Sequence, residues 1–554
     1  MKIGIYIAYH PMKNFSLKQE GLGRYLSYIV KSFVNNKHQV VIACPKWVVN
    51  AIEELFEEEN IDQSRVELLV SEAEPIMIKR YLKYLERKGK KRKVKKSIFK
   101  IVAIKKVDKI FDFILLMKND FVLMCLIFLT ILIGVIFLPF LLLLSIFTLL
   151  IKAINKLFHF EVKAIGIKKV FSYIKNRNFI FRSLYSHLEQ RYLTENKILY
   201  KIREDVANDI IRKIKNMKEP ADIWYSPMAF WPEFNKIQGN RVVCAPDLVT
   251  AEYATNFSYL KGVKNGTDEV RKTIQGGQFF ITYCEYLKNT LVVNQFGKNE
   301  DNVIAIPHAI NDMRESLEIS GGNKILIDAK NIQNQFSRMI LQTIANNIIN
   351  EKDYISSGRK MFAFQDVEYI FYASQIRGNK NIFNLIKAYE YLLRKKFITI
   401  KLFLTCNINI FPEIKEYIYE NRLQYDILCF HSVTSQQLGA LYSCAKLVVN
   451  PTLYEGGFPF TFGEGMSVGT PSVMSKIPQV MEVVEGYELE KYFFDPYNYL
   501  DMAAKIEYGL FHLDELYENE KILFDDLNKR TWTDVGEEYV KAFEYFIERS
   551  KAGA

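Results

Sequence analysis

The sequence predicts an α/β protein made of two domains, each with a parallel sheet. First, 554 residues are enough for two or three domains with separate cores, and 49% hydrophobic with 25% charged residues is typical of a globular chain. Second, strand, loop, helix and strand follow one another near both ends of the chain. Third, a glycine-rich loop joins a strand to a helix within residues 447–475. Strands that alternate with helices build parallel sheets.

The first domain is expected from two separate segments, 1–74 and 200–315. The first segment reads as the strand IGIYIA, a loop, the helical pattern GLGRYLSYIVKSFVNN and the strand QVVIACP. The alternation resumes after residue 200 with a helix ending at Met217, strands in ADIWYSP and RVVCAP, a helix near 276–286 and the strand NVIAIP. We expect the strands of both segments to complete one sheet.

Residues 75–199 interrupt this pattern and predict a helical membrane insert. The uncharged stretch Phe121–Ile151 is too long for one membrane span of about 20 residues and too short for two. Because its flanks must join one sheet, both lie on the same side of the membrane. Both flanks are rich in Lys and Arg, which is typical of the cytoplasmic side. We therefore expect a re-entrant hairpin bending near Gly134–Pro139; the alternative is a buried helical hairpin in a soluble protein.

The net charge of +11 comes entirely from one run. Residues 87–109 contain twelve Lys or Arg and one acid, Asp108, so the rest of the chain is neutral overall. A basic run beside an apolar segment favours anionic lipid head groups. A nucleic-acid binder, which would show salt-sensitive binding through this run, is the alternative, but the run lacks interleaved aromatic residues for base stacking. We expect no nucleic-acid partner.

Cysteine and carboxylate patterns predict no metal site and a reducing compartment. The seven cysteines are scattered and odd in number, and no Asp-x-Asp pair occurs. Lys2 is followed at once by a strand-like segment, so we expect no secretory signal peptide.

A second domain is expected at 366–530, after a linker and accessory helix at 316–365. It opens with YIFYASQIRGNKNIFNLIKAYEYLL, in which Arg377 and Lys380 stand at the start of the predicted helix. Cations at a helix amino terminus oppose its dipole unless an anion lies between them. A solvated basic face is the other interpretation. A last helix is expected at 531–554.

The loop within residues 447–475 predicts a ligand site. It follows the strand at Leu447–Asn450, carries Glu455, and leads into a short helix expected to open near Glu464. Free N–H groups at a helix amino terminus bind a diphosphate, and carboxylates accept hydrogen bonds from sugar hydroxyls. Alternatively, the two glutamates are a surface residue and a helix-end charge.

The stretch YEGGFPFTFGEGMSVGTP resembles the donor-binding motif of the group 1 family of retaining glycosyltransferases, which have the GT-B fold of two Rossmann-like domains facing a cleft. The family commonly has seven residues between its two glutamates; here eight separate Glu455 from Glu464. EGLGRY resembles the family's amino-terminal loop, and TSQQLGALY its helix before the donor loop. The resemblance also implies that the final helix crosses back to the first domain.

The resemblance assigns roles to particular residues. It implies donor contacts from Gly21, Arg377, Lys380, Glu455, Gly457, Phe458 and Glu464, and catalytic roles for Glu455, Asp247, Arg377 and Lys380. The family often has a His–Asp pair where this chain has Pro246 and Asp247, and a helix-capping role for Asp247 is the alternative. In IPHAI, His308 replaces the commoner Asn; it lines the cleft or is a structural histidine.

These observations predict a membrane-associated retaining glycosyltransferase at the cytoplasmic face of the cell membrane. It would transfer a sugar from a nucleotide-sugar donor to a lipid-linked saccharide or glycan acceptor in cell-surface polysaccharide or glycolipid synthesis. No metal and no cofactor beyond the donor are expected. A non-catalytic GT-B scaffold that recruits partners at the membrane is the alternative.

Overall fold

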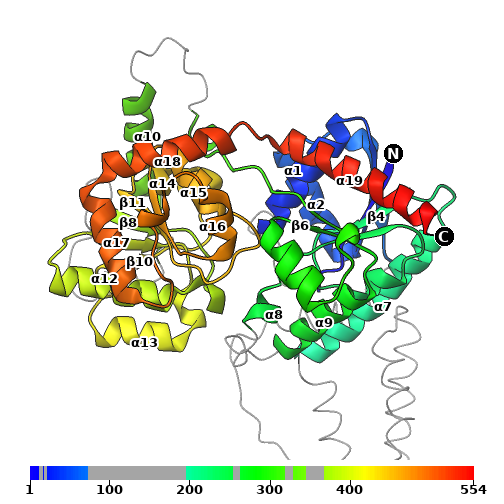
Figure 1. Cartoon of the computed structure of the whole chain (residues 1–554), viewed down its shortest axis with the longest axis horizontal. Coiled ribbons are helices and arrows are strands. Elements are labelled where there is room, and N and C mark those ends of the chain that lie inside the picture. Colours follow the sequence, from blue (N-terminus) through cyan, green and yellow to red (C-terminus); the bar gives the residue numbers. More distant parts are fainter. Residues whose placement is uncertain are drawn as a thin grey trace, which may run out of the picture.

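The computed structural model describes residues 1–10, 17, 21–72, 195–246, 248–253, 263–318, 329–344, 348 and 367–553. These residues form two domains that lie side by side (Figure 1). The predicted hydrophobic segment Phe121–Ile151 and its basic flanks lie outside the described residues, as does most of the predicted insert 75–199. Among the helices that are described, none is long and apolar enough to cross a membrane.

The amino-terminal domain contains a seven-stranded parallel sheet in the order β3-β2-β1-β4-β5-β6-β7. Its strands are β1 Lys2–Tyr6, β2 Gln39–Cys44, β3 Val66–Val70, β4 Ile223–Ser226, β5 Arg241–Cys244, β6 Phe279–Thr282 and β7 Val303–Ala305. Successive strands run outward from β1 to β3 and then, in the opposite direction, from β4 to β7. The order therefore reverses between β1 and β4, where loops on the two strands diverge.

Helices cover both faces of this sheet (Figure 1). They are α1 Gly21–Asn35, α2 Val49–Glu58, α7 Glu195–Lys215, α8 Val249–Glu252, α9 Val263–Gly276 and the π-helix η6 Leu287–Gln295. The strands β1 and β4, one from before and one from after the predicted insert, pair directly, with Ile3 opposite Ile223. Both segments therefore complete one sheet.

The carboxy-terminal domain contains a five-stranded parallel sheet in the order β10-β9-β8-β11-β12. Its strands are β8 Tyr369–Tyr372, β9 Lys401–Leu404, β10 Ile427–Cys429, β11 Leu447–Asn450 and β12 Ser472–Met474. The surrounding helices are α10 Ala329–Thr343, α12 Ile382–Lys395, α13 Pro412–Glu420, α14 Ser435–Ser443, α15 Phe460–Ser467, α16 Pro478–Val484, α17 Tyr499–Phe511 and α18 Leu513–Leu527. Here the strand order reverses between β8 and β11.

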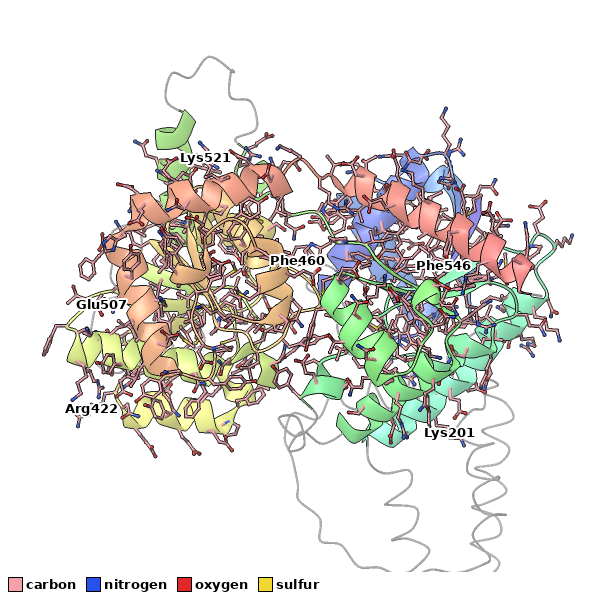
Figure 2. All side chains as sticks on the ribbon, in the orientation of Figure 1. Lys201, Arg422, Phe460, Glu507, Lys521 and Phe546 are labelled. Carbon is pink, nitrogen blue, oxygen red and sulfur yellow. The ribbon has the colours of Figure 1, made fainter. Side chains whose placement is uncertain are left out.

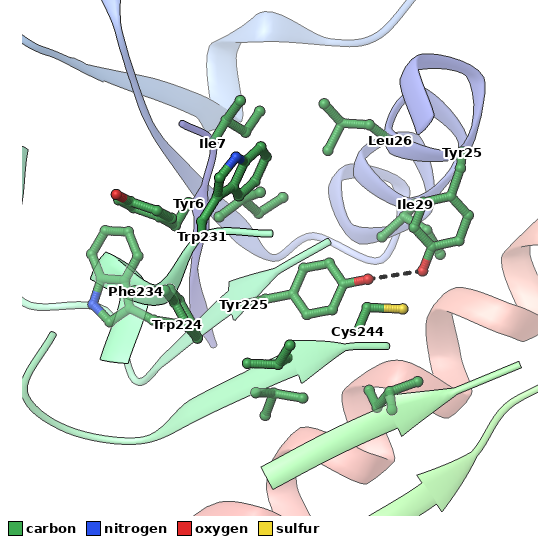
Figure 3. Close-up of a cluster of buried hydrophobic side chains, with 14 of the residues drawn as sticks. Tyr6, Ile7, Tyr25, Leu26, Ile29, Trp224, Tyr225, Trp231, Phe234 and Cys244 are labelled. Carbon is green, nitrogen blue, oxygen red and sulfur yellow. Dashed lines mark hydrogen bonds between the residues drawn. The ribbon is translucent and has the colours of Figure 1, made fainter. Parts of the chain in front are cut away.

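The last helix, α19 Trp532–Ala552, leaves the carboxy-terminal domain and lies along the amino-terminal one (Figure 1). Its residues Tyr539, Phe543 and Phe546 are fully buried in the amino-terminal core. Buried hydroxyls strengthen this attachment: the Tyr25 hydroxyl lies 3.0 Å from that of Tyr225, as Figure 3 shows, and also donates to the Tyr539 hydroxyl. The chain therefore passes between the domains twice, once before and once after the strands of the carboxy-terminal sheet in the sequence.

Two sequence-based predictions of local structure are wrong. The helix expected near 276–286 is instead the end of α9 followed by β6, because Phe279–Thr282 is buried on both faces and an apolar run carries no periodicity to distinguish strand from helix. The apolar segment KYFFDP also reads as a strand in the sequence, but it is a 3₁₀ turn, Glu490–Tyr492, followed by an isolated bridge between Phe494 and Ser475. The accessory helix expected within 316–365 is present as α10, Ala329–Thr343.

Candidate functional site

The loops that follow β8 and β11 meet at the point where the strand order of the carboxy-terminal sheet reverses. Ligands of open α/β sheets bind at such a point, beyond the carboxyl ends of the strands. The loop after β8 carries Arg377 and Lys380, and the loop after β11 carries Glu455. The topology thus brings these three residues of the sequence prediction to one edge of the sheet.

Lys380 and Glu455 form the central contact of this edge. The Lys380 Nζ lies 2.6 Å from Glu455 Oε1, and each side chain is about four-fifths buried, with 20% and 19% of its surface exposed. A short, partly buried ion pair fixes both groups in one geometry. A cation, which can bind a phosphate, therefore lies beside a carboxylate, which can accept a hydrogen bond from a hydroxyl.

Backbone contacts hold the two loops together beneath that ion pair. The Leu453 N–H donates to the Asn379 carbonyl at 2.7 Å, and Asn379 Nδ2 donates to the Tyr454 carbonyl at 3.1 Å. The hydroxyl of Thr452 bonds both of those carbonyls. The spacing between Lys380 and Glu455 is therefore set by buried polar contacts and not only by the charges themselves.

Arg377 lies at the exposed end of the same loop. It immediately precedes the short 3₁₀ turn Gly378–Lys380, and its Nη2 donates to Gln375 Oε1 at 3.0 Å. Asn381, in the left-handed region at φ 52°, then turns the chain into α12. Both cations thus precede the amino terminus of α12, and one of them, Lys380, is paired with Glu455.

Glu464 occupies a different position from the one expected. Helix α15 begins at Phe460, after Pro459, so Glu464 lies in the middle of the helix and not at its opening. Only 2% of its surface is exposed. Its carboxylate accepts hydrogen bonds from the Tyr442 hydroxyl at 2.7 Å and from Asn311 Nδ2 at 3.2 Å.

The supporting residues of Glu464 were not identified from the sequence. Tyr442 lies on α14, and Asn311 lies on the segment by which the chain first passes between the domains. Asn311 follows three residues after His308 in the motif that resembles the end of the family's first domain, and this is the one local signal that could have identified it.

The loop between β11 and α15, residues 451–459, contains glycines that allow it to approach the amino-terminal domain closely. A Cβ on Gly456 would lie 2.9 Å from both the Cβ and the carbonyl oxygen of Pro246, and one on Gly457 would lie 2.8 Å from the Tyr283 Cβ. Phe458, in contrast, is turned inward and packs edge-on against Phe462 at 5.2 Å. Gly457 therefore faces the other domain, whereas the Phe458 side chain belongs to the carboxy-terminal core.

His308 lies between the two domains. Its ring stacks on Phe460 at 4.1 Å and meets the edge of Tyr283 at 5.6 Å, and its Nδ1 donates to the Ala309 carbonyl at 2.9 Å. Burial lowers the pKa of His308, and backbone hydrogen bonds partly oppose this shift. Figure 2 shows Phe460 at the junction of the domains. A neutral histidine therefore packs in the domain junction.

The sequence also predicts two site residues in the first domain, Gly21 and Asp247. Gly21 is the first residue of α1, after the loop that follows β1, so its backbone lies at a helix amino terminus on the reversal point of the first sheet. Asp247 lies outside the described residues. Its neighbours Pro246 and Leu248 are described and face the donor loop.

A cavity of about 420 Å³ lies elsewhere, between α1, α2, α14 and the two interdomain crossings. It includes Asn311 and Trp532 but none of the residues that the sequence predicted for the site. We place the site at the meeting of the β8 and β11 loops, because that is where the sheet topology and the charged groups coincide. The described residues contain no group of three or more His, Cys, Asp or Glu arranged to hold a metal ion.

A known family model matches the carboxy-terminal domain. Residues 356–519 match the family model described as "Glycosyl transferases group 1", a range that includes Arg377, Lys380, Glu455 and Glu464. No curated protein matches the chain.

Solved structures resemble the whole chain. The amino-terminal domain of Candida albicans trehalose-6-phosphate phosphatase is 10% identical with a TM-score of 0.52, over 98% of this chain and 96% of that one. An Anabaena protein, Alr3699/HepE, solved in complex with UDP and glucose, is 11% identical with a TM-score of 0.51, over 98% of this chain and 99% of that one. At such identities the likeness concerns the fold alone. The carboxy-terminal domain thus matches the group 1 glycosyltransferases, and the whole chain has the two-domain GT-B fold.

Proposed function

We propose that this protein is a retaining glycosyltransferase that moves a sugar from a nucleotide-sugar donor to an acceptor hydroxyl. One observation carries the proposal: the Lys380–Glu455 ion pair, 2.6 Å long, lies where the strand order of the matched domain reverses. Lys380 would bind the donor diphosphate and Glu455 the hydroxyls of the adjoining sugar. The bond that breaks, between sugar and diphosphate, would then lie between these two groups.

The remaining residues complete a donor site. Arg377 stands before the same helix and would share the diphosphate charge with Lys380 and the Gly21 N–H. Glu464, buried and oriented by Tyr442 and Asn311, would accept hydrogen bonds from the nucleotide ribose. Glu455 would hold the sugar together with the backbone of Gly457 and Phe458. Protein groups of this kind contribute about 3 kcal/mol each to stabilising developing charge, so the reaction needs no metal.

The reaction proceeds with retention in this proposal. The bond between the sugar C1 and the diphosphate oxygen breaks, and the acceptor oxygen forms a bond to C1 on the same face. The acceptor proton passes to a diphosphate oxygen. Closure of the two domains over the donor excludes water and so favours transfer over hydrolysis.

A lipid-linked saccharide is the proposed acceptor. Phe121–Ile151 and the flanking Lys and Arg residues motivate this choice, because a soluble acceptor requires no membrane anchor. The enzyme would then act at the cytoplasmic face of a membrane, in the synthesis of a cell-surface polysaccharide or glycolipid. Asp247 would position the acceptor or the donor sugar.

Release of nucleoside diphosphate tests the proposal. The full chain in detergent is incubated with a lipid extract and with UDP-, GDP-, ADP- and TDP-linked sugars in turn. We expect release with one donor, and a loss of about 100-fold in the Lys380→Ala and Glu464→Ala variants. Lys387→Ala is the matched control, since this lysine lies on the following helix over the Phe383 ring and should leave the rate unchanged.

The same experiment distinguishes this proposal from the alternative, a non-catalytic scaffold. Release that is unaffected by Lys380→Ala or Glu464→Ala would contradict the site assignment. A chain that releases nothing from any donor would favour the non-catalytic scaffold.

A further inference from the structure

The residue before Glu455 connects the two domains. Tyr454 belongs by sequence to the donor loop of the carboxy-terminal domain, yet its ring packs within the hydrophobic core of the amino-terminal domain. Only 2% of its surface is exposed. A side chain buried in the opposite domain is fixed by that domain's packing.

The Tyr454 hydroxyl makes two hydrogen bonds to backbone groups just after β5, in Pro246 and Leu248. It donates to the Pro246 carbonyl at 2.8 Å and accepts from the Leu248 N–H at 2.9 Å. One hydroxyl thus bonds backbone groups on both sides of a single residue, as a hydroxyl can because it is both donor and acceptor. Phenylalanine would fill the same space and could make neither bond.

The main chain of Tyr454 is held from the other direction. Its carbonyl accepts from Asn379 Nδ2, within the turn that carries Lys380, and from the Thr452 hydroxyl. Gly456 extends the contact, since only a residue without Cβ can approach Pro246 this closely. Tyr454 therefore connects the turn that carries Lys380 to the backbone of Pro246 and Leu248 in the other domain.

We propose that Tyr454 is a positioning residue that fixes the backbone groups of Pro246 and Leu248, which follow β5, relative to the donor sugar. The inference rests on the proposed function and extends it. It proposes that the Tyr454 hydroxyl aligns the amino-terminal domain, where the acceptor would bind, with the donor site. Tyr454 does not contact the reacting atoms itself. Its loss lowers the rate of transfer while the donor still binds, since Lys380, Glu455 and Glu464 keep their own contacts.

The test combines kinetics with hydrogen exchange on the full chain in detergent. In Tyr454→Phe we expect kcat for transfer to fall about tenfold or more, with the donor KM within about threefold of wild type. The Leu248 amide, bonded to the missing hydroxyl, should exchange about tenfold faster or more.

Tyr497→Phe is the matched control. Its hydroxyl also bonds across the interface, to the Tyr253 hydroxyl at 3.1 Å, but the residue is 62% exposed and lies outside the donor loop. We expect kcat and the exchange of Leu248 to stay within twofold of wild type in this variant.

The proposal would be overturned by exchange of Leu248 that is unchanged in Tyr454→Phe, or by a transfer rate within twofold of wild type. A rise in donor KM that accounts for the whole loss would also overturn it, because the hydroxyl would then serve donor binding. Exchange needs no turnover, so it tests the interdomain contact even if no donor is consumed. Failure of the proposed function therefore remains distinguishable from failure of this inference.

Discussion

Replacing Tyr442 by phenylalanine isolates the support of the buried Glu464 carboxylate. The Tyr442 hydroxyl donates to Glu464 Oε2 at 2.7 Å, whereas its ring packs edge-on against Phe371 at 4.9 Å and is preserved in the variant. A hydrogen bond to a charged group contributes about 1.5–3 kcal/mol. We therefore expect the free energy of unfolding of the carboxy-terminal domain to fall by about 2 kcal/mol.

Calorimetry of the full chain measures this change. For a domain of this size, about 2 kcal/mol corresponds to a decrease of about 4–8 °C in melting temperature. Tyr389→Phe is the matched control, because that buried hydroxyl donates to a neutral backbone carbonyl, Ile400, at 2.8 Å. Its loss should cost about 1 kcal/mol.

A double-mutant cycle identifies the source of the difference. In a Glu464→Gln background the acceptor is neutral, so the cost of Tyr442→Phe should fall to about 1 kcal/mol. The same cost in both backgrounds would refute the reasoning, since the negative charge of Glu464 would then contribute nothing to the bond.

Two further predictions concern pH and the membrane. Burial raises the pKa of Glu520 well above its ordinary 4.5, against the opposing effect of its hydrogen bonds from Ser472. The folded state therefore keeps a proton that the unfolded state loses. The contribution of Glu520 to stability is fully present below about pH 4.5 and falls by about 1.4 kcal/mol per pH unit above it until the folded pKa is reached. Glu520→Gln should remove this slope in melting curves at successive pH values; an unchanged slope would assign it to other groups. Replacing residues 121–151 by a Gly/Ser linker should move the protein from the membrane pellet to the supernatant, and continued sedimentation with lipid would contradict the proposed anchor.

Strand positions could be predicted where the sequence pattern is local. The segments at Leu447–Asn450 and Tyr369–Tyr372 read as strands because short apolar runs there end in turn residues, and they are β11 and β8. The helix that follows Arg377 and Lys380 is also predicted correctly, because its apolar residues recur at helical spacing. Phe279–Thr282 could not be assigned in this way, because the segment continues through Tyr283–Leu287 without a turn residue to end it.

Residue identity by itself determined which charged groups to consider: two cations before a helix and two glutamates around a glycine-rich loop. Only the tertiary structure decided how they are held. It pairs Lys380 with Glu455 and buries Glu464 beneath Tyr442 and Asn311. It also places the Tyr454 ring in the core of the other domain. Such contacts join residues far apart in the chain, so no spacing or periodicity records them; they form only when folding brings these loops and helices together.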